Sequence, residues 1–431
     1  MANQHSIGIS RAARVLLGCL AAAVVIAQPS RAVAQAVSPK GHISQFRITE
    51  PTRLDWIFAL ANQSPAEEPV GLLKDYDSTK QRFELYVPRR YDKQKPSSLI
   101  LFISPGQKGT GLAQFRALCD RKGVLFASPY QAGNQTPGPR RIRIVMDTLD
   151  EVRRRYNVDP DRTYIGGFSG GGRIAFTIAT ALPEYFGGIL PVCAGGQLRQ
   201  ESWLRQRVID RLRIAMLTGE TDFNRGEIER MTQTQLSGVG ATSRVWTVAR
   251  IGHGIPSGNT LTEAYDWLEE GLKDRQALAK RFPASRISDA PSRSEWAGQL
   301  LAEARSRLKT DESPYAGLMQ LKGLHTRWND LPGAQQALKT LQEYDSAADR
   351  PWEAEDIAEQ RRFLIAQARG VDAYATGPLP KQYEKQKASM INAAIRLWSS
   401  VVQDGQDEAA VAEANRRLPI LKAVAMSNLE K

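Results

Sequence analysis

The chain has 431 residues, of which 42% are hydrophobic and 24% charged, and its formal net charge is +12 at pH 7. This composition is that of a globular protein and excludes a collagen-like, coiled-coil or wholly disordered chain, while the length predicts two or three domains. With three cysteines, four histidines and no C-x-x-C, H-x-x-H or H-E-x-x-H motif, we expect no metal site.

The first 34 residues have the pattern of a signal peptide. Arg11 and Arg14 precede an apolar run at 15–27, and Ala-Val-Ala at 32–34 has the form of a cleavage site. The run is too short to cross a bilayer as a mature helix. We therefore expect export, to the periplasm or out of the cell, with no membrane span after cleavage. An uncleaved anchor and a lipoprotein signal ending at Cys19 are the alternatives.

Apolar runs typical of strands then alternate with amphipathic stretches typical of helices. We assign residues 35–74 to an N-terminal extension and residues 75–280 to the domain that holds this alternation. The expected strands are 81–88, 98–104, 123–128, 163–167, 187–193, 213–219 and 242–248, and the clearest helices are 109–121, 141–156 and 172–182. Strands that alternate with helices predict an α/β fold class with a mostly parallel central sheet.

The composition changes after about residue 280. Proline and serine are frequent at 281–293, which predicts a linker. Residues 294–431 show no strand pattern and predict a separate all-α domain. Ala-rich helix starts recur near 334–337 and 408–414, as in tetratricopeptide-like hairpins, and a small helical bundle is the alternative. We expect the tryptophans of this region to lie in its core: Trp296, Trp328, Trp352 and Trp398.

Residues 167–171 (GFSGG) fit the pattern G-x-S-x-G. An apolar strand precedes the motif and an amphipathic segment follows it, which is the context of a nucleophile at a tight strand-to-helix turn. Such a turn needs small residues two before and two after the serine, here Gly167 and Gly171. Ser169 is therefore the predicted nucleophile. The N–H of Gly170, at the helix N-terminus, is a predicted oxyanion donor.

A serine nucleophile requires a base, which is usually histidine. In this architecture the chain order is serine, acid, histidine. His5 and His42 precede the serine, and His325 falls within the helical region. His253, on a Gly-His-Gly loop after the strand 242–248, is the remaining candidate.

The acid is expected after the strand that lies between serine and histidine. Asp222 follows the end of the strand 213–219 and would accept a hydrogen bond from the imidazole, fixing its tautomer. Glu220 in the same loop is the alternative, because loop geometry decides which carboxylate points inward.

Further motifs resemble those of secreted α/β-hydrolase esterases. LYVP at 85–88 with Tyr91-Asp92, and VDPDR at 158–162 leading into GGFSGG at 166–171, are similar to segments of polyhydroxyalkanoate depolymerases, feruloyl esterases and prolyl-oligopeptidase-like hydrolases. The resemblance covers about residues 75–275. It implies an α/β-hydrolase fold, serine esterase chemistry without a cofactor, and Ser169, Asp222 and His253 as nucleophile, acid and base.

One segment departs from the family pattern. Where these enzymes usually have His-Gly after the strand before the first crossover helix, this chain has Ser104-Pro105-Gly106-Gln107. Proline has no N–H. Gly106 or Gln107 is then expected to supply the second oxyanion donor.

The substrate is expected to be a small or soluble ester. The loop 129–139 leaves the carboxyl end of a central strand, where ligands bind in such sheets. Tyr130, Gln131 and Asn134 are therefore candidate pocket residues. The alternative is that they are ordinary loop residues without a role in binding. The arginine runs at 140–143 and 153–155 are expected to be solvated helix faces, so no nucleic acid partner is expected.

Two other function classes stay open at this point. One is a non-catalytic hydrolase-fold scaffold whose helical domain binds a protein partner, favoured by the Ser104-Pro105 departure. The other is a serine peptidase. Cys119 and Cys193 would either pair in an oxidising compartment or stay as buried thiols.

Overall fold

The computed structural model describes residues 39–309, 314–350, 352–377 and 381–427. The predicted signal peptide lies outside these residues, so its cleavage stays a prediction. Within the described ranges, no helix combines the length and the apolar composition that a membrane crossing needs.

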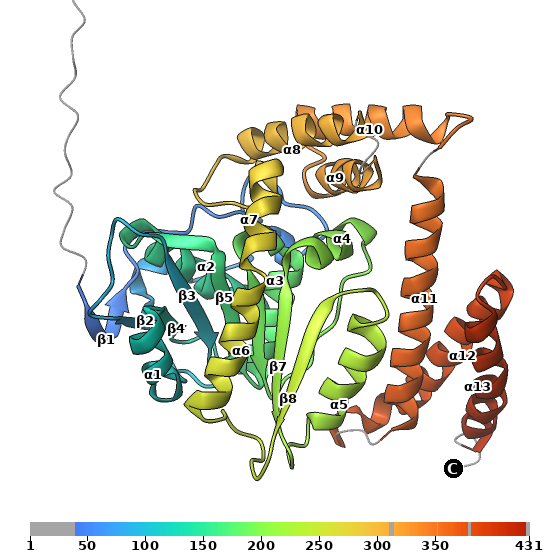
Figure 1. The fold of residues 1–431 in the computed structure, drawn as a ribbon, viewed down its shortest axis with the longest axis horizontal. Helices are drawn as coiled ribbons and strands as arrows, with labels where there is room; N and C mark the ends of the chain where they lie inside the picture. The colour runs from blue at the N-terminus through green and yellow to red at the C-terminus, as the bar shows by residue number, and fades with distance from the viewer. Residues whose placement is uncertain (1–38, 310–313, 351, 378–380, 428–431) are drawn as a thin grey trace, which may run out of the picture. The chain divides into compact units, whose positions relative to one another are not determined.

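The described chain is built on one eight-stranded sheet with the order β1-β2-β4-β3-β5-β6-β7-β8 (Figure 1). Strand β2 is antiparallel to both of its neighbours, and all pairs from β4 to β8 are parallel. This order with an antiparallel second strand is the α/β-hydrolase fold, as predicted. The strands are β1 (Gly41–Arg47), β2 (Arg82–Val87), β3 (Ser97–Ile103), β4 (Leu125–Pro129), β5 (Val158–Phe168), β6 (Gly188–Val192), β7 (Arg213–Gly219) and β8 (Thr242–Val248).

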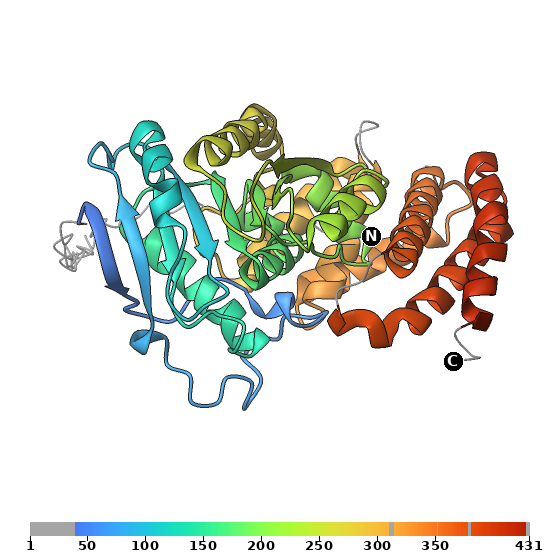
Figure 2. The ribbon, with the colours of Figure 1, turned by 90° about the horizontal axis from the view of Figure 1, so that it is seen from below.

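Helices cover both faces of this sheet (Figures 1 and 2). The helices of this part are α1 (Leu112–Lys122), α2 (Gly138–Arg155), α3 (Gly170–Ala181), α4 (Ser202–Arg211), α5 (Arg225–Arg230), α6 (Gly258–Glu270) and α7 (Leu272–Arg281), with short helical turns η1 (Ile57–Ala59), η2 (Ser78–Lys80), η3 (Pro183–Tyr185) and η4 (Met231–Leu236).

Strand β3 lies between two hydrophobic cores, which explains why its sequence is continuously apolar. Leu99, Leu101 and Ile103 belong to the core shared with α2, α3 and α4, whereas Ile100 and Phe102 belong to the core shared with α1 and α6. Side chains alternate between the two faces of a strand, so a strand with helices on both faces needs apolar residues at every position.

Strand β1 is not among the strands that the sequence pattern predicts. It lies within the segment assigned as an N-terminal extension, and His42, Ser44 and Gln45 make it largely polar. It pairs only with β2 at the edge of the sheet. Such a strand buries too little side-chain surface to show an apolar run.

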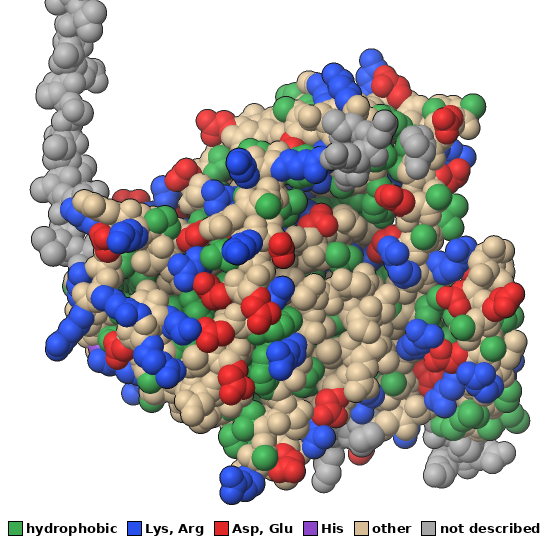
Figure 3. Space-filling view, in the orientation of Figure 1, with side chains coloured by type: hydrophobic (Ala, Val, Ile, Leu, Met, Phe, Trp, Pro, Cys, Tyr) green, Lys and Arg blue, Asp and Glu red, His purple; other side chains and the backbone are tan. Residues whose placement is uncertain are grey.

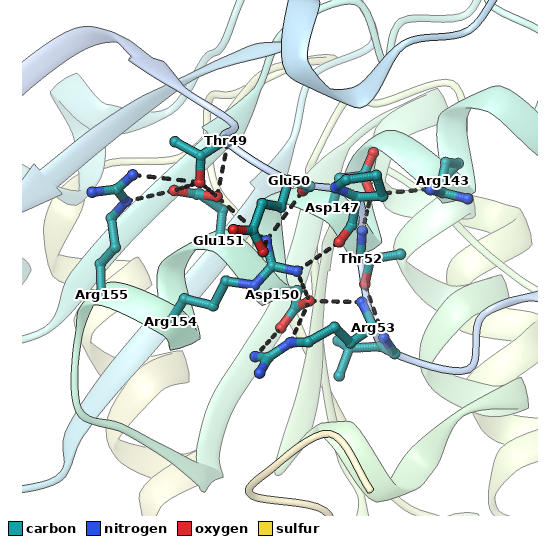
Figure 4. A network of polar contacts seen from close by, with 12 residues as sticks. Thr49, Glu50, Thr52, Arg53, Arg143, Asp147, Asp150, Glu151, Arg154 and Arg155 are labelled. Carbon is teal, nitrogen blue, oxygen red and sulfur yellow. Dashed lines mark hydrogen bonds and ion pairs between the residues drawn. The ribbon is translucent and has the colours of Figure 1, made fainter. Parts of the chain in front are cut away.

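The segment that follows β1 is fixed to α2 by carboxylates (Figure 4). Thr49, Thr52 and Arg53 donate their backbone N–H groups to Glu151, Asp147 and Asp150, at 3.0, 2.8 and 2.8 Å. All three acidic side chains are buried. Their oxygens therefore satisfy backbone donors that have no partner strand.

The same cluster corrects the expectation that the arginine runs are solvated. Arg141 and Arg143 are buried, and Arg154 and Arg155 pair with carboxylates on α2 itself. Burial lowers the pKa of Arg153 to about 10. These arginines hold the fold together instead of forming an open basic surface.

The described residues of the C-terminal region form helices and turns and no strand, as predicted. Its helices are α8 (Arg293–Leu308), α9 (Pro314–Arg327), α10 (Pro332–Asp345), α11 (Glu353–Thr376), α12 (Lys387–Asp404) and α13 (Glu408–Ser427), with turns η5 (Pro283–Ser285) and η6 (Lys381–Gln386). Helix α8 begins with a capping box between Ser292 and Glu295. The four tryptophans named above are all buried, which confirms their role in the core.

The helical region has two cores. Helices α8 to α10 share the core that includes α2, α3 and α4, and α11 to α13 form a second core around Trp398. Helix α11 contacts both, since its Ala366 belongs to the first core. The expected linker is packed, since Ala284 and Ile287 are buried. Arg205 on α4 and Glu359 on α11 form a buried ion pair, 2.6 Å between Nε and Oε1, that joins the two cores.

Candidate active site

Ser169 occupies a sharp turn between β5 and α3. Its backbone has φ +52° and ψ −123°, a conformation that is strained for any residue with a Cβ atom. A Cβ atom on Gly167 would lie 2.5 Å from the carbonyl carbon of Gly171, and one on Gly171 would collide with the carbonyl of Ile103. The turn is therefore possible only with glycine at both positions, as the motif predicts.

The turn is fixed at the carboxyl ends of the central strands. Ser169 donates its N–H to the carbonyl of Val192, at 2.8 Å. Ile103, Phe168 and Val192 are the last residues of β3, β5 and β6. The hydroxyl of Ser169 thus lies at the edge of the sheet where ligands bind in parallel α/β proteins.

The loop between β8 and α6 brings His253 to this serine. Its Nε2 atom lies 3.0 Å from the Ser169 Oγ atom, and its Nδ1 atom lies 2.7 Å from Oδ1 of Asp222. The three side chains, from positions 169, 222 and 253, form one continuous hydrogen-bonded chain. The spacing matches that of a nucleophile, base and orienting acid.

Asp222 lies in the loop between β7 and α5 and is buried. Burial alone would raise the pKa of its carboxyl, but hydrogen bonds from the Asn224 N–H, His253, Thr218 and Cys193 hold the pKa below the usual value. Asp222 is therefore a stable anion beside His253.

Glu220, the alternative acid, is engaged elsewhere. Its Oε2 atom accepts the N–H of Arg250 at 2.9 Å. Of the two carboxylates in this loop, only Asp222 is hydrogen-bonded to His253.

Cys193 directly follows β6, and its side chain is hydrogen-bonded to Asp222. Its Sγ atom, the Asp222 carboxylate and a ring nitrogen of His253 lie within 4.8 Å of one another, a grouping that could bind a metal ion. The chemistry of the donors fits a metal poorly. Burial raises the pKa of the Cys193 thiol to about 12, whereas a metal binds the thiolate, and His253 already uses Nδ1 for Asp222. The thiol and that of Cys119 are both free and buried.

The two candidates for the second oxyanion donor, the N–H groups of Gly106 and Gln107, differ in whether they already have an acceptor. The Gly106 N–H donates to Oγ of Ser104 at 3.1 Å. The Gln107 carbonyl accepts from the Gln131 N–H at 2.7 Å. Among the described residues the Gln107 N–H has no acceptor, so of the two it is the one open to a ligand.

Not all of the candidate pocket residues on the loop 129–139 lie near Ser169. Asn134 is exposed, and its side-chain amide lies against Gly170, beside Ser169. Gln131 is exposed, with φ +58°, and contacts the 105–107 loop through its backbone. The Tyr130 hydroxyl instead donates to the Ser44 carbonyl on edge strand β1, four places from β5 in the sheet. The structure thus brings Asn134, but not Tyr130, to Ser169.

Sequence reasoning missed three contributors to this site. Arg141 is buried and donates to the carbonyls of Ala132 and Gly170, at 2.7 and 3.0 Å, so it ties the 129–139 loop to the start of α3. Phe168 and Phe223 flank the imidazole of His253. Phe223 directly follows the predicted acid, which is the one signal that could have found it; nothing in the sequence pattern marks Arg141.

No protein-family model and no curated protein matches this chain. Solved structures that are similar to part of it include a thermostable esterase, at 22% sequence identity and a TM-score of 0.34, covering 46% of this chain and 61% of the esterase. The S-formylglutathione hydrolase of Staphylococcus aureus shows 10% identity and a TM-score of 0.35, covering 47% of this chain and 96% of that enzyme.

A puromycin-hydrolysing peptidase of Mycobacterium tuberculosis is similar at 12% identity with a TM-score of 0.36, covering 48% of this chain and 42% of the peptidase. Each of these likenesses covers less than half of this chain, and the thermostable esterase is matched over less than two thirds of its own length. The fold assignment therefore rests on the strand order of the sheet: residues 41–248 have the α/β-hydrolase fold.

Proposed function

We propose that this protein is a serine hydrolase that cleaves carboxylic esters through an acyl-enzyme on Ser169. The observation that carries the proposal is the hydrogen-bonded chain from the Ser169 hydroxyl through both nitrogens of His253 to the Asp222 carboxylate. The strained, glycine-flanked turn at Ser169 supports it, because a structural serine has no need of such a conformation.

In the first half of the reaction, Ser169 Oγ attacks the ester carbonyl carbon and its proton passes to Nε2 of His253. The carbonyl oxygen becomes an anion that accepts hydrogen bonds from the Gly170 and Gln107 N–H groups. The partial positive charge at the start of α3 favours the same anion. The C–O bond to the alcohol then breaks, and His253 returns its proton to the departing oxygen.

In the second half, water replaces the alcohol. His253 removes a proton from the water, the hydroxide attacks the acyl carbon, and the acid leaves as Ser169 regains its proton. Asp222 stays ionised throughout, and its hydrogen bond to Nδ1 leaves Nε2 as the atom that accepts the proton.

The resemblance to secreted esterases favours an ester over an amide, and we propose a small or soluble ester as the substrate class. We also propose export, on the pattern of the first 34 residues. A protein partner at the helical region stays a prediction.

The test is pre-steady-state hydrolysis of 4-nitrophenyl acetate by wild type and Ser169→Ala. We expect a burst of nitrophenol equal to the enzyme concentration in wild type and none in the variant. Ser399→Ala, which changes an exposed serine on α12, is the control that keeps the burst. A burst of the same size in Ser169→Ala would contradict the proposal. The corresponding anilide, run beside the ester, tests the ester preference.

A further inference from the structure

The ring of Phe223 is unusual among the described residues. Phe223 is 69% exposed, and it is the one aromatic residue among the exposed large hydrophobic residues of the described ranges. We propose that its outward face binds a flat apolar group on the alcohol side of the ester substrate. This inference rests on the proposed function and names the substrate class of the same site.

The position of Phe223 is fixed by its two neighbours. Asp222 and Asn224 are 5% and 6% exposed. The Asn224 N–H donates to Oδ1 of Asp222 at 3.0 Å, and its side chain donates to the Cys193 carbonyl at 2.9 Å. Phe223 is therefore the exposed residue of a loop that is anchored in the fold on both sides of it.

One face of the Phe223 ring is covered by His253. The ring centroids are 4.1 Å apart and the planes differ by 24°, which is a stacked arrangement. Phe168 contacts the same imidazole at 4.9 Å between centroids. The imidazole thus has two aromatic neighbours, and the exposure of Phe223 belongs to the face and edges that His253 does not cover. That remaining surface can stack with a second flat group.

The chemistry assigns this surface to the alcohol part of the ester. His253 has to return its proton to the departing oxygen, so this oxygen must come within hydrogen-bond distance of Nε2. A group attached to that oxygen therefore lies beside the imidazole and its aromatic neighbours. The acyl part is bonded to the opposite side of the carbonyl carbon. The predicted substrates are esters of alcohols that carry a benzyl-sized ring or a comparable flat apolar group.

The experiment compares benzyl acetate with methyl acetate. Their alcohols have nearly the same acidity and their acyl groups are identical, so the ratio of the two kcat/KM values reports contacts with the benzyl ring. We expect Phe223→Ala to lower this ratio about tenfold, the size of one aromatic contact, and Phe223→Leu to lower it less. Val70→Ala, which truncates another exposed apolar side chain, should leave the ratio unchanged. Methyl phenylacetate against methyl acetate, which varies only the acyl side, should keep its ratio in Phe223→Ala.

The readout in ratios cancels any general effect on His253. An unchanged benzyl-to-methyl ratio in Phe223→Ala, or a change only in the acyl-side ratio, would overturn the inference. Labelling of Ser169 by a fluorophosphonate separates this result from failure of the proposed function. Labelled Ser169 without benzyl discrimination overturns the role of Phe223 alone, whereas an unlabelled, folded protein without ester hydrolysis overturns both.

Discussion

Gly167 and Gly171 touch across the turn that carries Ser169: a Cβ atom on Gly167 would lie 2.5 Å from the carbonyl carbon of Gly171 and 2.6 Å from its oxygen. Both obstacles are backbone atoms, which cannot rotate away as a side chain can. The positive φ of Ser169 depends on this close approach. The shape of the candidate site is therefore set by two residues that carry no functional group.

Gly167→Ala should lower the free energy of unfolding by about 2–3 kcal/mol, because the methyl group forces the turn apart. It should also abolish hydrolysis, since the turn positions Ser169. Gly298→Ala is the matched control. Gly298 lies inside α8 with open space around its Cβ position, so alanine there should raise stability by about 0.5–1 kcal/mol. Urea unfolding of both variants measures these changes. An unchanged free energy of unfolding in Gly167→Ala would contradict the prediction.

Asp222→Asn should reduce kcat by about a thousandfold or more, because an amide does not fix the imidazole tautomer as a carboxylate does. Glu220→Gln is the control in the same loop, and we expect kcat within about threefold of wild type, since Glu220 accepts a backbone N–H instead of bonding His253. Steady-state hydrolysis of one ester by both variants decides the matter. An equal loss in the two variants would mean that the loop, and not the carboxylate of Asp222, is what matters.

The depressed pKa of Asp222 predicts a pH dependence of stability. Its carboxyl has a usual value of 3.8 and a lower value in the folded protein. Between these two values the unfolded chain binds more protons, so stability rises with pH there. The stabilisation by ionised Asp222 is complete above about pH 5 and is lost as the pH falls through the folded pKa. The difference in unfolding free energy between wild type and Asp222→Asn should therefore shrink below pH 4. Urea unfolding from pH 3 to pH 7 measures it, and a difference that grows on acidification would contradict the assignment.

The sequence leaves open whether Cys119 and Cys193 form a disulfide or stay as free thiols, and alkylation distinguishes the two. Both thiols are free and buried, and burial raises the pKa of each. We expect no alkylation of Cys119 or Cys193 by iodoacetamide in the native protein and full alkylation in urea without a reductant. Peptide mass mapping provides the readout. Alkylation in urea that appears only after reduction would show that the two residues form a disulfide.

Much of the sheet could be predicted because its strands are buried on both faces. Runs such as SLILFI in β3 are continuously apolar, and the predicted ranges agree with the structure to within a few residues. Strand β5 is the largest difference. It begins at Val158, whereas the apolar pattern predicts a start at Thr163, because most of its first five residues, VDPDR, are polar. Edge strand β1 was missed for the same reason, since a half-exposed strand shows no apolar run.

The candidate site could be predicted as far as chain order and strand ends determine it. Ser169, Asp222 and His253 each follow a strand that ends at one edge of the sheet, so local patterns bring them together. Contacts between distant side chains leave no such pattern. Arg141 reaches the Gly170 carbonyl from α2, and Tyr130 turns to β1 instead of the site; both depend on how loops pack.

The role of Ser169 as nucleophile is tested most directly by treating the protein with a fluorophosphonate and mapping the adduct by peptide mass, with Ser169→Ala and His253→Ala beside wild type. We expect one adduct, on Ser169, that is absent in Ser169→Ala and forms much more slowly in His253→Ala, because the serine needs its base to react. A folded wild-type protein without adduct, or one labelled on another serine, would contradict it.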